Sequence, residues 1–319
     1  MLRPLLLLSL CACAAGAVPA QASPWGKQPY GLVIVGEGGG ADADWDKFVA
    51  ELRKAFGKRY PMETFSGPVA TRDLQQSLDR LKAAKVQKII VVPVFLSSQD
   101  PALEQLQYLL GLRQFPSEAF LSSWKMKAQI VPRVKVPAPL VLTWALDDDP
   151  VIAEILYSRA KEMSREPRKE SVVIVGEGLA KDADNAVLQR RLDGLSQKVA
   201  KQGGFSAVRA VLLRPDAEKA PMQAERTEHA LTKTIRGLSY TSRVIVVPYL
   251  LTRDGRARAW RKNLDNLFFR WNEKGLLPDA RLGRWVDAQV GSFRDTADMV
   301  RFKDAGQALP PPERKRNVK

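Results

Sequence analysis

A six-residue segment occurs twice in this chain. Residues 33–38 read Val-Ile-Val-Gly-Glu-Gly, and residues 173–178 repeat them letter for letter. The match continues into Asp-Ala-Asp at 42–44 and at 182–184, at the same offset. In a second pair, Lys88 and Arg243 each precede four β-branched residues and a proline. The chain is therefore predicted to be a tandem of two similar units.

Hydrophobic patterning predicts alternating strands and helices in both units. Short apolar runs indicate buried strands, and apolar residues spaced three or four apart indicate helices. In the first unit we expect strands at 31–36, 89–96 and 140–146, and helices at 41–56, 71–84, 101–113 and 149–163. In the second we expect strands at 172–176, 207–213 and 243–251, and helices at 185–201, 219–237 and from 257 onward. This order predicts an α/β fold with parallel sheets.

The domain boundaries follow from the repeat and from a charged linker. Residues 165–170 are charged and contain Pro167, so we expect domains at 27–166 and 170–295, followed by a basic, Pro-containing tail at 296–319. In each domain a glutamate between glycines, Glu37 or Glu177, ends the first strand. Open α/β sheets bind their ligands at the carboxyl ends of their strands.

The first 22 residues are typical of a secretory signal peptide. Arg3 precedes an apolar run that is short for a membrane span, and cleavage is expected after Ala22. Cleavage there removes Cys11 and Cys13, the only cysteines, so the mature protein has no disulfide or thiolate site. The alternatives are a lipoprotein anchored to the membrane at Cys13 and an uncleaved anchor. All three place the body outside the cytoplasm, in the periplasm or secreted.

The net charge of +15 narrows the choice of partners. It serves solubility or attracts an acidic ligand or surface. Nucleic acid is not an expected partner, because no nucleic-acid-binding motif accompanies the charge.

Four further motifs carry a family resemblance. They are Phe-Leu-Ser-Ser-Gln at 95–99, Tyr-Leu-Leu-Gly-Leu-Arg at 108–113, Ala-Leu-Asp-Asp-Asp-Pro at 145–150 and Leu-Leu-Pro-Asp at 276–279. With the Gly-x-Gly and Val-Val-Pro strand ends, they resemble the class II chelatases of the CbiX/SirB type, in their long two-domain form. The resemblance implies two flavodoxin-like domains facing each other across a cleft. It also implies an anionic tetrapyrrole such as sirohydrochlorin, a divalent metal (Co²⁺ or Fe²⁺) as substrate, and no organic cofactor.

The chain departs from the family pattern where the chemistry is expected. The family has histidines between the two glycines and shortly after Val-Val-Pro, and here Glu37 and Gln99 stand in those places. The resemblance therefore assigns Glu37 and Gln99 to the metal and catalytic site, and Glu177 replaces the second unit's histidine. A carboxylate favours harder cations and is a poor base unless burial raises its pKa, and Gln cannot titrate. The sequence leaves open whether the protein inserts metal or is a degenerate chelatase that only binds or scaffolds.

The remaining ligand contacts are expected on both sides of the cleft. Ser97 and Ser98 lie beside Gln99 in the first unit. In the second, a basic stretch is predicted to bind the ligand's carboxylates, with an indole available to stack, through Arg253, Arg256, Arg258 and Trp260. The alternative for this stretch is a solvated helix face.

Several acidic residues also have a structural interpretation. Glu37 and Glu177 suit helix N-termini, where a negative charge offsets the helix dipole. The same interpretation covers Asp42, Asp44, Asp182 and Asp184. Asp149 either caps the next helix or binds a cation with its neighbours Asp147 and Asp148, and Asp279 occupies another place where the family often has histidine. His229, the only histidine, is expected on the surface of a helix.

Overall fold

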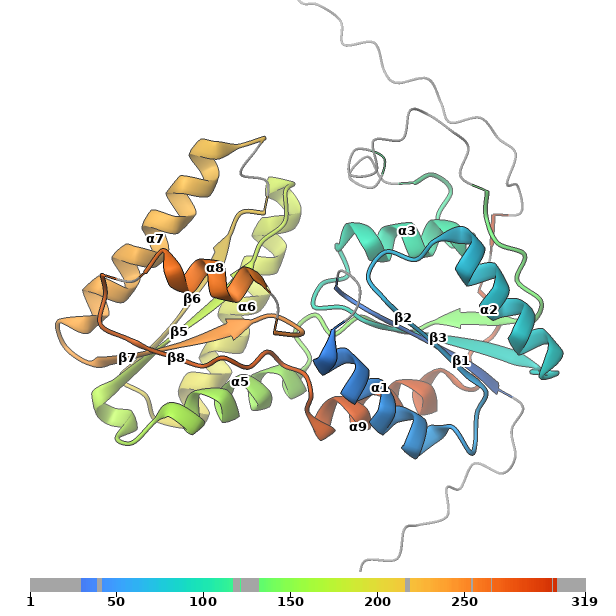
Figure 1. The fold of residues 1–319 in the computed structure, drawn as a ribbon, viewed down its shortest axis with the longest axis horizontal. Helices are drawn as coiled ribbons and strands as arrows, with labels where there is room; N and C mark the ends of the chain where they lie inside the picture. Colours follow the sequence, from blue (N-terminus) through green and yellow to red (C-terminus); the bar gives the residue numbers. More distant parts are fainter. Residues whose placement is uncertain are drawn as a thin grey trace, which may run out of the picture.

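The computed structural model describes residues 30–38, 42–116, 121, 132–215, 219–253, 255–264, 266–299 and 301–302. These residues form two four-stranded parallel sheets, one in each unit (Figure 1). The first has the order β2-β1-β3-β4, and consists of β1 (Tyr30–Gly36), β2 (Met62–Ser66), β3 (Lys88–Val94) and β4 (Leu140–Leu142). The second has the order β6-β5-β7-β8, and consists of β5 (Glu170–Glu177), β6 (Ala207–Leu213), β7 (Arg243–Tyr249) and β8 (Arg270–Trp271). The predicted α/β fold with two flavodoxin-like units is confirmed.

Helices cover both faces of each sheet. The first unit contributes α1 (Ala43–Phe56), α2 (Thr71–Ala83), α3 (Pro101–Leu109) and α5 (Pro150–Met163). The second contributes α6 (Asp182–Gly203), α7 (Pro221–Ser239), α8 (Gly255–Lys262) and α9 (Ala280–Phe293), and the short 3₁₀ helix at Pro167–Lys169 precedes it. Because the sheets are covered on both sides, the central strands β1 and β3 are buried along almost their whole length.

The last helix of each unit packs on the other unit. Helix α5 contacts α6 and β7, whereas α9 contacts α1 and β3 (Figure 1). One hydrophobic core therefore runs through both units, from Leu32 in β1 to Val172 in β5. Because of this exchange, the two packed bodies differ from the sequential halves, and the division at 27–166 and 170–295 stays a prediction.

Two buried cations fasten the exchanged helices. The Lys88 ammonium donates to the backbone oxygens of Phe293 and Arg294 at 3.2 and 2.6 Å, at the C-terminal end of α9. Arg159 in α5 donates to the Gly275 and Leu276 oxygens at 3.0 and 3.3 Å, in the segment that leads to α9. Both side chains complement backbone carbonyls that would otherwise be desolvated without a donor.

Five elements differ from the sequence-based expectation. Strands β2 and β8 and helix α9 were not predicted, and the expected strand at 140–146 ends at Leu142. β2 reads Met-Glu-Thr-Phe-Ser and is only half-buried at most positions, so it lacks a buried strand's apolar run. The expected helix at 101–113 ends at Leu109, followed by Gly111 with a positive φ of 78°.

Candidate functional site

A small cavity lies where the strand ends of the two units meet. It measures about 40 Å³ and is lined from the first unit by Glu37, Ser97 and Asp100, and from the second by Glu177 and Tyr249. Both glutamates of the repeat therefore face the same space. That space has room for a water molecule or an ion but is far below the roughly 300–1,000 Å³ of a small-molecule site.

Glu37 is held by the backbone of the neighbouring strand. Its N–H donates to the Val94 oxygen at 3.1 Å, and its carboxylate accepts the Leu96 N–H at 2.8 Å. The side chain is half-buried at the end of β1. This hydrogen bond holds the carboxylate at the edge of the cavity.

Tyr249 fills the second unit's side of the cavity. Its side chain is 1% exposed, and its hydroxyl donates to the Leu96 oxygen at 3.2 Å across the boundary between the units. Burial raises the pKa of the Tyr249 phenol, and the negative charge of Glu37 raises it further. Tyr249 in β7 pairs with Gly176 in β5. Val94 takes the equivalent position in the first unit, where it pairs with Gly36.

Asp100 is a titratable group at the cavity that the sequence analysis did not select. It caps α3, and its carboxylate accepts the Ala102 N–H at 2.7 Å. Burial raises the pKa of this carboxyl, although its backbone hydrogen bonds and the charge of Arg256 oppose that effect. The sequence analysis expected a helix from residue 101, but nothing in the sequence indicated that the residue before it faces the cavity.

Glu177 is bound by a charged side chain of its own unit. Its carboxylate forms an ion pair with the guanidinium of Arg256, from α8. The repeat therefore keeps the position of the glutamate, and in the second unit Arg256 lies beside it.

Gln99 is bound to an arginine of the second unit. Its side-chain oxygen accepts from the Arg191 guanidinium at 2.8 Å, and Arg191 also pairs with Asp147. Ser98 joins this cluster, because its N–H donates to Asp147 at 2.8 Å and its hydroxyl lies 3.3 Å from Arg191. A cationic donor on the Gln99 oxygen opposes metal coordination there, and Gln99 is not among the residues that line the cavity. Arg191 lies in the middle of α6 as an ordinary polar helix residue, so the sequence pattern did not single it out.

Arg253 joins the units through a bidentate contact with Asp44. It donates to the Asp44 carboxylate through Nε and Nη2, both at 2.8 Å, and its backbone N–H adds a third bond at 3.2 Å. Asp44 is 2% exposed. Burial alone would raise the pKa of Asp44, but the hydrogen bonds and charge of Arg253 outweigh it and hold that pKa below its usual range. Asp44 lies in the first turn of α1, as predicted, but its larger role is this bridge.

The rest of the basic stretch divides between surface and core. Arg258 is exposed on α8, whereas the partly buried Trp260 packs against the core of the second unit. Asp254 lies outside the described residues. The structure thus brings Arg253 and Arg256 to the boundary between the units and leaves Arg258 on the surface.

The helix-capping interpretation is confirmed for Asp149, and Asp279, for which no cap was predicted, caps a helix as well. Asp149 caps α5 by accepting the Val151 N–H at 2.9 Å, and it also accepts the Trp285 indole N–H at 3.1 Å. Asp279 caps α9 and pairs with Arg281 at 2.8 Å. Burial acts to raise the pKa of Asp279, but the bonds to Arg281 outweigh it and lower that pKa.

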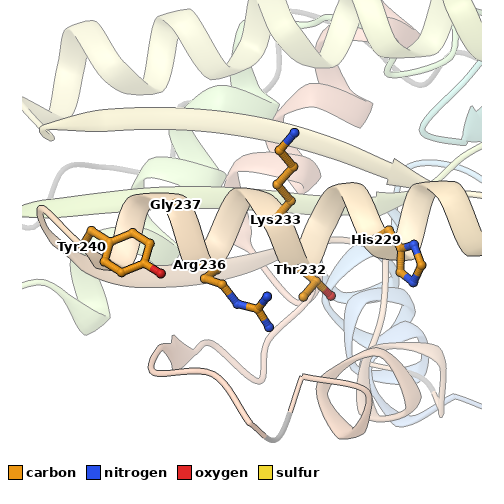
Figure 2. A pocket seen from close by; sticks show the side chains of 6 residues that line it. All are labelled: His229, Thr232, Lys233, Arg236, Gly237 and Tyr240. Carbon is orange, nitrogen blue, oxygen red and sulfur yellow. The ribbon is translucent and has the colours of Figure 1, made fainter.

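His229 lies on the exposed face of α7, away from the strand-end cavity. It lines a surface hollow of about 310 Å³ together with Lys233, Arg236 and Tyr240 (Figure 2). Its imidazole lies 3.9 Å from the Glu225 carboxylate, one helical turn away. The expectation of a surface helix residue is confirmed.

The described part of the chain contains neither a metal-binding cluster of side chains nor a membrane-spanning helix. No group of three or more His, Cys, Asp or Glu side chains within it is arranged to hold a metal ion. No helix in the same residues is long and apolar enough to span a membrane. The predicted signal segment, with Cys11 and Cys13, lies outside the described residues.

The two units with their facing strand ends define a chelatase-like α/β fold, and comparison with known proteins agrees. The family model CbiX matches residues 31–163, which run from β1 to the end of α5. No curated protein sequence matches the chain.

Solved structures of two chelatases share the fold over both units. The sirohydrochlorin chelatase SirB from Bacillus subtilis subspecies spizizenii, solved in complex with cobalt, is 13% identical, with a TM-score of 0.58 over 85% of this chain and 99% of SirB. SirB from Bacillus subtilis with Fe³⁺ is 12% identical, with a TM-score of 0.55 over 85% of this chain and all of that one. The resemblance to CbiX/SirB-type class II chelatases is confirmed.

A longer protein also contains this fold. DR2241 from Deinococcus radiodurans, a multi-domain protein with structural similarity to chelatases, is 16% identical, with a TM-score of 0.51. The match covers 86% of this chain and 57% of DR2241.

Proposed function

We propose that this is an exported, chelatase-like protein that binds a divalent metal, Co²⁺ or Fe²⁺, and an anionic tetrapyrrole such as sirohydrochlorin between its two units. The observation that carries the proposal is the shared cavity, which Glu37 and Glu177 line from equivalent strand ends. The CbiX match and the SirB-like fold support it, because open α/β sheets bind their ligands at the carboxyl ends of their strands, where this cavity lies.

Two carboxyl groups of the first unit supply the chemistry. Metal insertion needs a weak metal site and an acceptor for the pyrrole protons. Glu37 places a carboxylate at the cavity, where the Leu96 N–H holds it, and carboxylate oxygens can bind a divalent cation. Burial raises the pKa of the Asp100 carboxyl, which makes it a better proton acceptor than an ordinary aspartate. Gln99 positions Arg191 in this scheme and does not ligate the metal.

The tetrapyrrole enters only after the two units separate. A cavity of about 40 Å³ is far too small for the ring. Separation breaks the Arg253–Asp44 pair between the units and gives access to the Arg256–Glu177 pair. Both arginines then face the incoming carboxylates of the ligand, which replace the internal ones.

The direct test is a spectroscopic titration of the protein without its predicted signal segment. Sirohydrochlorin is added with and without Co²⁺, and the ring's absorbance bands are followed. The proposal expects a saturable change on ring binding, and formation of the metallated ring that is faster than in buffer and is slowed in Glu37→Gln. An unchanged absorbance spectrum in both titrations would contradict the proposed function.

The second candidate is a binding or scaffold protein that has lost metal insertion. The ion pairs that close the boundary between the units favour it, as does the occupation of Gln99 by Arg191. The same titration separates the two candidates. If the protein only binds or scaffolds, the ring binds but the metallated ring forms no faster than in buffer. Glu37→Gln then binds the ring as well as the wild type does.

Export is tested separately from chemistry. Expression in a bacterial host and mass spectrometry of the mature N-terminus distinguish the routes. Signal cleavage predicts Ser23 as the first residue, whereas lipidation predicts a diacylglycerol-modified Cys13 in the membrane fraction. A full-length chain in the cytosol contradicts both.

A further inference from the structure

A groove on the first unit is separate from the strand-end cavity, and the two have no lining residue in common. It measures about 650 Å³, within the range of small-molecule sites. Its walls come from three separate segments: the end of α3 at Leu110 and Gly111, residues 133–136, and the segment after α9, residues 298–302. We propose that this groove binds an amphipathic anion, a molecule with one anionic head on an apolar body.

The wall after α9 is fixed to the sheet edge by its backbone. The Met299 N–H donates to the Leu140 oxygen at 3.0 Å, and the Leu140 N–H donates to the Asp298 carboxylate at 2.7 Å. Farther along, the Phe302 N–H donates to the Gly111 oxygen at 2.7 Å. These bonds cover the exposed edge of β4 and hold the segment beside it, so the groove is a built feature of the fold.

Gly111 allows the two walls to approach closely. Its φ is 78°, and a Cβ at this position would lie 3.1 Å from the Phe302 oxygen. A side chain here would be strained at this φ and would require the Phe302 backbone to shift by a few tenths of an ångström. The glycine therefore allows the close approach of the two walls.

The floor and sides of the groove are apolar. Leu110 and Val134 are buried beneath it, and the partly buried Val136 and Met299 continue the apolar lining. At the rim, Phe302 is 46% exposed. An apolar body placed here would remove these surfaces from water, which is the main favourable contribution to binding.

The charges at the groove select the head group. Among its described lining residues, Arg133, Lys135 and Arg301 are cationic and Asp298 alone is anionic. Asp298 already pairs with Arg301 at 2.9 Å. The Arg133 guanidinium stacks on the Tyr108 and Phe302 rings, 4.9 and 5.8 Å from their centroids, so its positive charge stays at the apolar wall. The excess of positive charge favours a carboxylate or a phosphate ester over a neutral or cationic head.

Calorimetric titration with three probes tests head and body separately. Dodecanoate, below its micellar concentration, should bind with a stoichiometry of one. Dodecyltrimethylammonium, which carries the opposite charge on the same chain, and acetate, which lacks the chain, should both bind at least about tenfold more weakly. Equal affinity for the two dodecyl compounds, or no saturable binding of dodecanoate, would overturn the proposal.

Matched variants locate the site. Lys135→Glu reverses an exposed charge at the groove and should weaken dodecanoate binding about tenfold. Phe302→Ala removes part of the apolar rim and should weaken it about fivefold. Lys233→Glu makes the same charge change on α7 (Figure 2) and should leave the affinity unchanged. If Lys135→Glu binds dodecanoate like the wild type, or Lys233→Glu weakens it equally, the groove is not the site. Glu37→Gln should not affect this binding, which separates it from the chelatase proposal.

Discussion

The two strand ends of the repeat share a backbone and differ in the side chains beside it. In the first unit Val94 lies opposite Gly36, and the Glu37 carboxylate accepts the Leu96 N–H. In the second, Tyr249 takes the place of Val94, and Glu177 pairs with Arg256. A duplicated fold can thus keep a carboxylate at one position while the neighbouring side chains change. The proposed function assigns cation chemistry to Glu37 in the first unit and anion chemistry to Arg256 in the second.

The largest expected effect on stability comes from breaking the Arg253–Asp44 ion pair between the units. Arg253→Ala leaves the buried Asp44 carboxylate without its guanidinium. Breaking a buried ion pair from one side costs about 3–5 kcal/mol, and the half-exposed arginine places this pair at about 3 kcal/mol. Urea unfolding measures the loss. Arg258→Ala, on the exposed side of α8, is the control and should change stability by less than about 0.5 kcal/mol. Equal losses in both variants would show that Arg253 does not join the units.

Replacing Gly36 or Gly176 with alanine tests how tightly the end of each first strand is packed. A Cβ on Gly36 would lie 2.2 Å from the Trp45 ring, and one on Gly176 would lie 2.8 Å from the Tyr249 ring. Overpacking costs about 1–3 kcal/mol, so Gly36→Ala should lose about 2 kcal/mol and Gly176→Ala about 1 kcal/mol. Gly237→Ala, in α7 with nothing within 4 Å of the added carbon, should be neutral or stabilising. The reverse order for Gly36 and Gly176 would contradict the packing described for the two ends.

Acid should weaken the contact between Asp44 and Arg253. The folded-state pKa of Asp44 is lowered, so its stabilisation is present above the unfolded-state pKa of about 4 and is lost as the pH falls through the lowered folded-state value. Asp44→Asn should therefore cost about 1.5 kcal/mol at pH 7 and progressively less below pH 4. The check is a series of urea midpoints from pH 7 to pH 3 for both proteins. Asp46→Asn, an exposed change in the same helical turn, should show no such convergence.

Much of the fold could be predicted because its central strands are apolar runs. Residues 31–36 and 244–249 are buried on both faces, so their hydrophobicity alone identified them. β2 was missed because it lies at the edge of the sheet and every residue after Met62 is half-exposed, and β8 was missed because it has only two residues. The exchange of α5 and α9 could not be read from the sequence, since an amphipathic helix does not indicate which sheet it covers.

The candidate site was predictable in position and not in pairing. The repeat placed Glu37 and Glu177 at strand ends, and the structure brings both to one cavity. Their partners come from elsewhere: Leu96 supplies a backbone N–H, and Arg256 lies far from Glu177 in sequence. Arg191 and Asp100 were missed because a single polar residue on a helix, or at its start, has the same local pattern whether it faces solvent or another domain.

Metal affinity tests the division of labour between the strand ends most directly. Co²⁺ is titrated calorimetrically into the wild type, Glu37→Gln and Arg256→Gln. Removing the Glu37 charge should weaken Co²⁺ binding at least about tenfold, as loss of a ligand or its close support usually does. Removing the Arg256 cation releases Glu177 from its ion pair and should strengthen Co²⁺ binding. Wild-type affinity in Glu37→Gln, or weaker binding in Arg256→Gln, would contradict the assignment of cation chemistry to the first unit.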